Sequence, residues 1–229
     1  MRLFAFLLAL LPCTTKAIPD SGKLGSESDP IRQALFASQS MKDLLAHVQL
    51  NGAPGAFQKI ADAHKAVNTG NKPEAISLLR SGLALPQLET REQLWLWSAL
   101  RELGEKPDAR AAYEVVGVVI EMPSGDGYDT LAAYQDGSAR YLNFSGKAIF
   151  WDKKEDTGIR ALCQGFIDSA IPFGNRAQPR TSLSLPKSGG QVTLLTRSGN
   201  YVIKNPPQSV INAGAGLMME LIKRTTESK

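Results

Sequence analysis

Residues able to do acid–base or nucleophilic chemistry are few in this 229-residue chain. It has two histidines, His47 and His64, and two cysteines, Cys13 and Cys163. Both histidines fall in amphipathic helical patterns, which strongly disfavours a histidine-based triad or a histidine-rich metal site. Cys163 lies on the apolar side of another helical pattern, which indicates a small buried hydrophobe. We therefore predict no catalytic residue of these types and no metal site.

Carboxylates offer a second kind of chemistry. Asp126, Asp129, Tyr134 and Arg140 surround the first predicted hairpin. If these side chains converged in a concave pocket, they could support hydrolase-like or other acid–base catalysis. The stretch "SGDGYD" that holds both aspartates has too few regularly spaced oxygens for a calcium loop and indicates a turn. An enzyme built on these four residues is the alternative hypothesis.

A cofactor site is not expected. The stretch "NAGAGLM" offers Gly214 and Gly216, but Met219 occupies the third glycine position of a dinucleotide motif, and no strand precedes it. Close helix packing explains these glycines better. The sequence predicts no cofactor.

The elements that must position any site begin after an unusual N-terminus. Met1-Arg2 precedes the apolar run "LFAFLLALLP", and Thr15-x-Ala17 offers a cleavage point before Ile18. This pattern predicts a signal peptide over residues 1–17 and a periplasmic or secreted protein. A lipoprotein anchored through Cys13, or a buried N-terminal helix, are the alternatives. The polar stretch 18–30 predicts a flexible linker.

Charge and composition limit the partners. The chain is 43% hydrophobic and 21% charged, as soluble globular proteins are. Loss of Arg2 and Lys16 with the signal would leave 24 of the 26 basic residues against 22 acidic ones. A net charge of +2 predicts no nucleic-acid binding, and no membrane span is expected after signal removal. The oligomeric state is left open.

Residues 31–112 show helical patterns with an internal period. "GNKPEA" at 70–75 returns as "GEKPDA" at 104–109, a spacing of 34 residues. This spacing and the turn glycines resemble tetratricopeptide repeats. The resemblance implies helical hairpins rather than a peptide-binding array, because only two copies are present. After the second copy, "VVGVVIEM" predicts a strand, so we expect the helices to run directly into a sheet.

The rest of the chain predicts a sheet with helices. Residues 113–229 show a four-strand segment, a helical pattern in the stretch 156–171, a hairpin near Ser198–Asn200 and a C-terminal helix from about Ser209. The predicted fold class is α+β with an antiparallel sheet. The helices and the sheet domain should pack as one unit, with Trp95 and Trp97 against the strands.

One face of this sheet is a candidate interaction surface. If Asp136-Gly137 and Ser145-Gly146 form two-residue turns, one face carries Tyr134, Tyr141, Asn143 and Phe150. The other face carries Leu131, Ala133, Leu142 and Ile149. The aromatic face is either a second core under the helices or an open platform for a partner.

The stretch Ala133–Gly146 also carries a resemblance. Its pattern "AYxDGSARYxNxSG" resembles a group of uncharacterised bacterial proteins, which implies a bacterial origin and no particular activity. Together these observations predict an exported, non-catalytic interaction or scaffold protein, with another protein as the expected partner.

Overall fold

The computed structural model of the protein describes residues 29–47 and 55–227. The predicted signal peptide, Cys13 and most of the predicted linker lie outside the described residues. The predicted α+β class is confirmed, because helices flank one antiparallel sheet of seven strands. Asp29 and Pro30, which we predicted to be linker, instead begin the first described helix, where the Asp29 carboxylate accepts a hydrogen bond from the Ile31 amide.

The segment before the sheet is helical, as predicted. Its helices are α2 (Pro30–Ala34), α3 (Met41–His47), α4 (Gly55–Asn68), α5 (Lys72–Leu83) and α6 (Thr90–Glu102). Gly70, with φ +78°, ends α4, and the side chain of Asn71 caps α5 by accepting from the Glu74 amide. At the second "GxKPxA" copy, Gly104 again takes a positive φ, but residues 103–113 form turns and no helix follows.

The sheet begins directly after those turns. Its strands are β1 (Val115–Ser124), β2 (Gly127–Tyr134), β3 (Ala139–Leu142), β4 (Ala148–Trp151), β5 (Gln178–Pro179), β6 (Gln191–Thr196) and β7 (Gly199–Lys204). The spatial order is β4-β3-β2-β1-β6-β7-β5. Helix α7 (Thr157–Ala170) and the short 3₁₀ helix η1 (Ile171–Arg176) follow β4, and α8 (Gln208–Glu227) ends the described chain. The β6–β7 turn is Arg197-Ser198, slightly earlier than predicted.

Two hairpin loops are one residue longer than the predicted two-residue turns. In the first, the Tyr134 amide donates to the Ser138 carbonyl, which leaves a loop of residues 135–137 with Gly137 at φ +86°. In the second, Asn143 and Lys147 close a loop of residues 144–146 in the same way. Since side chains alternate between the faces of a strand, each extra residue reverses the face of the next strand.

The predicted aromatic face is therefore wrong. Leu131 pairs with Tyr141, and Tyr141 pairs with Ile149, so Tyr141 shares a face with residues that we placed opposite it. Asn143 follows Tyr141 to that face. Tyr134 and Phe150 lie on the other face, with Leu142. The four interaction candidates thus divide into two pairs.

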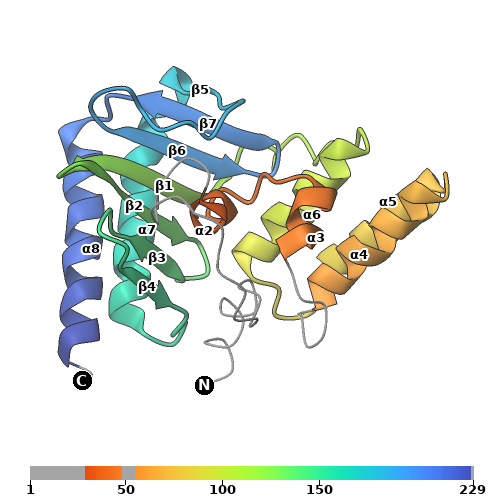
Figure 1. Cartoon of the computed structure of the whole chain (residues 1–229), viewed down its shortest axis with the longest axis horizontal. Helices are drawn as coiled ribbons and strands as arrows, with labels where there is room; N and C mark the ends of the chain where they lie inside the picture. The colour runs from red at the N-terminus through yellow and green to blue at the C-terminus, as the bar shows by residue number, and fades with distance from the viewer. Residues whose placement is uncertain (1–28, 48–54, 228–229) are drawn as a thin grey trace.

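Helices cover both faces of the sheet (Figure 1). One face packs against α7 and α8 around a core that includes Val118, Phe166 and Leu217. The other packs against the N-terminal helices, in a core that runs from Phe57 in α4 through Trp95 to Tyr134. Helices α4 and α5 form the edge of the molecule farthest from α8 (Figure 1).

Candidate functional site

An apolar pocket of about 250 Å³ lies between the sheet and α8. We call it the α8 pocket. Strands β1 to β3 form one wall and α8 the other, because alternate residues of β1 and β2 point toward that helix. Its lining residues are Ile120, Met122, Pro123, Ser124, Asp129, Leu131, Tyr141, Ile211, Gly214, Ala215 and Met218. Most of these are apolar, so Asp129, Tyr141 and Ser124 provide its polar side chains.

Asp129 is held firmly at the polar end of the α8 pocket. One of its carboxylate oxygens accepts a hydrogen bond of 2.7 Å from the hydroxyl of Tyr141. The other accepts from the amide of Phe144 at 3.0 Å and from the side-chain amide of Asn143 at 3.2 Å. These bonds connect β2 to the β3–β4 loop, so they fix the direction of the carboxylate as well as the loop.

The donors around Asp129 are neutral. Asn143 also donates to the Tyr141 oxygen at 3.0 Å, which joins the three side chains in one network. Burial is the main cause that raises the pKa of the Tyr141 hydroxyl; the Asn143 bond opposes it and Asp129 reinforces it. The hydroxyl therefore remains a donor to the carboxylate. Asp129 makes no ion pair with any of the residues that the structure describes.

Helix α8 approaches the sheet closely because of a glycine. A Cβ at Gly214 would stand 3.3 Å from the ring of Phe166 in α7 and 3.5 Å from Ile120 in β1. The absence of a side chain there sets the depth at which α8 lies on the sheet. This agrees with the helix-packing interpretation of "NAGAGLM".

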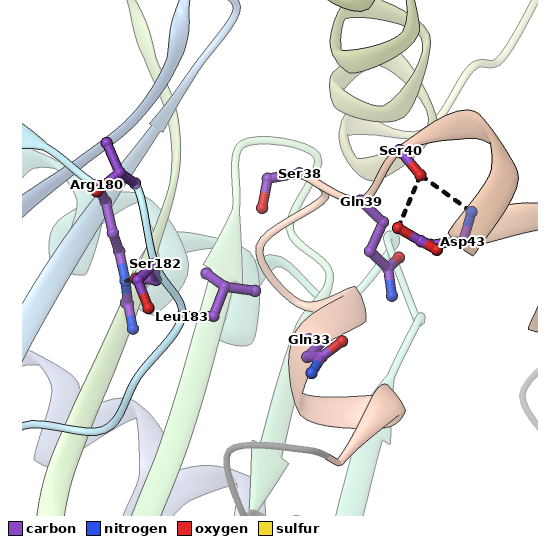
Figure 2. Close-up of a pocket in the computed structure, with 9 residues that line it drawn as sticks. Gln33, Ser38, Gln39, Ser40, Asp43, Arg180, Ser182 and Leu183 are labelled. Carbon is purple, nitrogen blue, oxygen red and sulfur yellow. Dashed lines mark hydrogen bonds between the residues drawn. The ribbon is translucent and has the colours of Figure 1, made fainter.

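A second hollow of about 470 Å³ lies between the α2–α3 segment and residues 180–183 (Figure 2). Figure 2 shows Gln33, Ser38 and Gln39 on one side, with Arg180 and Leu183 on the other. The Ser40 hydroxyl and Asp43 form hydrogen bonds to each other at one end. The walls thus carry mainly hydroxyl and amide groups.

The charge of Arg180 in this second hollow is already used inside the protein. Its guanidinium pairs with Glu121 at 2.9 Å, donates to Thr193 and to two backbone carbonyls, and lies 4.4 Å from the centre of the Phe36 ring. Burial is the main cause that lowers its pKa, while Glu121 opposes that effect. Arg180 therefore stabilises the fold and offers little to a ligand.

Glu121 is the centre of a buried charge network. Both Arg32 and Glu121 are 0% exposed, and Arg32 pairs with one oxygen of Glu121 while Arg180 pairs with the other. Gln191 also donates to Glu121, at 2.8 Å. The network connects α2, β1, β6 and the loop after β5. Sequence reasoning missed it, although a lone glutamate in the valine-rich run "VVGVVIEM" was a signal.

The four residues of the enzyme hypothesis do not converge. Tyr134 is buried on the face opposite Asp129, where its hydroxyl donates to the Leu35 carbonyl at 2.8 Å. Burial raises the pKa of Tyr134 to about 12. Arg140 is also buried there and pairs with Asp152, while Asp126 is exposed in the β1–β2 turn. Of this set, the structure brings only Asp129 to the α8 pocket.

Phe150 and Cys163, the other residues singled out in the sequence, both lie in packed surroundings. Phe150 is half-buried, and the guanidinium carbon of Arg140 lies 5.7 Å from the centre of the Phe150 ring. Cys163 is fully buried on α7, and burial is the main cause that raises its pKa to about 12, which fits the predicted structural role.

Within residues 29–47 and 55–227, no cluster of His, Cys, Asp or Glu could hold a metal ion. None of the helices in these ranges combines the length and the apolar character of a membrane span.

Comparison with family models, with curated proteins and with solved structures finds no match to this chain. A fold alone does not define an activity, so the chemistry of the two hollows carries the functional evidence. Of the two hollows, the α8 pocket has the features typical of a binding site: apolar walls and a few fixed polar groups.

Proposed function

We propose that this protein is an exported, non-catalytic binding protein, and that the α8 pocket binds a small, mainly apolar molecule. The observation that carries the proposal is the combination of an apolar cavity of about 250 Å³ with one carboxylate fixed by neutral donors. Ligand pockets commonly measure about 300–1,000 Å³, so the expected ligand is smaller than a typical drug. The separation of Asp129 from Tyr134 and Arg140 on two faces of the sheet supports binding over catalysis.

The scaffold part of the prediction concerns the helical side of the molecule. We infer that α4 and α5 act as a tetratricopeptide-like unit. The supporting observations are the Gly70 turn and the complete burial of Ala75 and Leu79, the small and bulky positions of the repeat pattern. Another protein remains the predicted partner for this part of the chain.

Binding in the α8 pocket can be tested by NMR of the methionine methyl groups. Met122 in β1 and Met218 in α8 line the pocket. Met219, also in α8, is 62% exposed and provides an internal reference. Titration with 1-hexanol should shift the Met122 and Met218 signals saturably and leave Met219 unchanged. A molecule of this size is expected to bind with a Kd on the order of 1 mM.

Ala215→Leu is the variant that tests the pocket. Ala215 lines the pocket, so the larger leucine side chain should fill part of it, and leucine is well accepted in helices. The variant should abolish the hexanol-dependent shifts, while Met219→Leu on the exposed side should preserve those of Met122 and Met218. Equal shifts in Ala215→Leu would refute the proposed site, as would unchanged pocket signals with 1-hexanol and with its amine and acid analogues.

Export is tested separately, by sequencing the N-terminus of the protein produced in a bacterium with two membranes. The signal pattern of residues 1–17 predicts a mature chain that begins at Ile18 in the periplasmic or secreted fraction. A mature chain that begins at a diacylated Cys13 would instead identify the protein as a lipoprotein. Recovery of Met1 from the cytoplasm would contradict export.

A further inference from the structure

We propose that the ligand of the α8 pocket carries an ammonium group, which the carboxylate of Asp129 binds. This inference rests on the proposed binding function and adds the chemical class of the ligand. It follows from the charge, the hydrogen bonding and the surroundings of Asp129.

The charge of Asp129 has no internal partner among the described residues. Its hydrogen-bond donors are the Tyr141 hydroxyl, the Asn143 side-chain amide and the Phe144 backbone amide, all of them neutral. By contrast, Glu121 pairs with two arginines, and Asp152 pairs with Arg140. A negative charge on the wall of an apolar pocket is most favourable when a cation pairs with it.

The carboxylate also has room for another donor. A carboxylate has about four acceptor positions, and the hydrogen bonds to Asp129 come from three donor groups. Among the described residues, the oxygen that Tyr141 contacts has one further, weak contact, with the Asn143 amide at 3.4 Å. This oxygen can therefore accept a hydrogen bond from a ligand without losing an existing partner.

The rest of the pocket specifies the rest of the ligand. Met122, Leu131, Ile211 and Met218 enclose the space beside Asp129 with apolar surface. The Ser124 hydroxyl, also on the wall, can accept a second ammonium hydrogen. A ligand carboxylate would meet Asp129 as a like charge, and a neutral head group would leave the charge unpaired. A small alkyl or aryl amine satisfies both parts of the pocket.

Three ligands with one apolar body test this proposal: hexylamine, 1-hexanol and hexanoate. Each is titrated into the full chain near pH 7, and the Kd is measured from the Met122 and Met218 methyl signals. Both hexylamine and hexanol can donate to the carboxylate, but only the ammonium also supplies an opposite charge beside the apolar wall. Hexylamine should therefore bind about tenfold or more tightly than hexanol, and hexanoate more weakly than either.

Asp129→Asn removes the charge and retains an acceptor. In this variant the preference for hexylamine over hexanol should fall to about threefold or less, with hexanol affinity nearly unchanged. Asp126→Asn is the control, because Asp126 is exposed in the neighbouring turn and does not line the pocket. It removes an equal charge from the same hairpin and should retain the full preference.

The outcomes separate this inference from the proposed function. If hexanol or hexanoate shifts the pocket methyls and binds as tightly as hexylamine, the pocket is a binding site and the ammonium proposal is wrong. If none of the three ligands shifts them, both proposals fail. If Asp129→Asn does not fold, the Kd values of the three ligands for the wild type still show which head group the pocket prefers.

Discussion

Glu121→Ala is expected to lower the free energy of unfolding by about 3–5 kcal/mol, because it leaves two buried arginines without their shared counter-charge. Arg32 and Glu121 are both fully buried, and Nη1 of Arg32 already has no hydrogen-bond partner among the residues that the structure describes. Without the carboxylate, Arg32 and Arg180 would face each other as like charges inside the protein. The loss should appear as a lower midpoint in urea-induced unfolding at neutral pH.

A surface ion pair provides the matched control. Glu114 pairs with Arg197, and the Glu114 side chain is 46% exposed. Glu114→Ala should therefore change the free energy of unfolding by less than about 1 kcal/mol. If Glu121→Ala also costs less than about 1 kcal/mol, the buried network does not hold α2 and the loop after β5 against β1. A double variant, Arg32→Met with Glu121→Leu, should recover part of the loss, since it also removes one of the two arginine charges that Glu121→Ala leaves unpaired.

The fold could be predicted in outline because its signals are local. Hydrophobic periodicity and turn residues indicated the helices before the sheet, α7, α8 and every strand except the two-residue β5. The turn glycine at the start of the first repeat copy, Gly70, lies just after α4 with a positive φ for the same reason. These features depend on residues within a few positions of one another.

The faces of the sheet could not be predicted, because they depend on one residue in each loop. The sequence Asp136-Gly137 suits both a two-residue turn and a three-residue loop. Asp136 decides between them: its carboxylate accepts from both the amide and the hydroxyl of Ser138. The extra residue in the β2–β3 loop moves Tyr141 away from the face of Tyr134, and the extra residue in the β3–β4 loop returns Phe150 to that face.

The candidate site was half visible in the sequence. Asp129, Tyr141 and Asn143 were selected, and they do form one network. The opposite wall, with Ile211 and Met218, comes from a helix about eighty positions further along the chain. Contacts at such a separation leave no periodic signal in a single sequence. Polar residues of the hairpin could therefore be chosen, but their apolar partners could not.

Trp95→Ala is expected to destabilise the whole molecule by about 3–5 kcal/mol in a single transition. Trp95 is 5% exposed and lies 4.9 Å from the ring of Phe57 in α4, measured between ring centres. Arg91 stands over both the Trp95 and the Tyr134 rings, each at 5.7 Å. The same core thus includes α4, α6 and β2, so a cavity at Trp95 should weaken contacts on the helices and on the sheet together.

The measurement follows unfolding by far-UV circular dichroism and by hydrogen exchange of the β1, β2 and β6 amides. If the helices and the sheet form one unit, both signals should shift to the same lower denaturant concentration. Trp97, which is only partly buried at the edge of this core, is the matched tryptophan, and Trp97→Ala should cost less than Trp95→Ala. Because the two residues lie on one helix and differ mainly in burial, the comparison separates lost packing from lost helix propensity. Two transitions, with only the helical one shifted by Trp95→Ala, would instead show that the N-terminal helices fold independently and use the sheet face merely as a support.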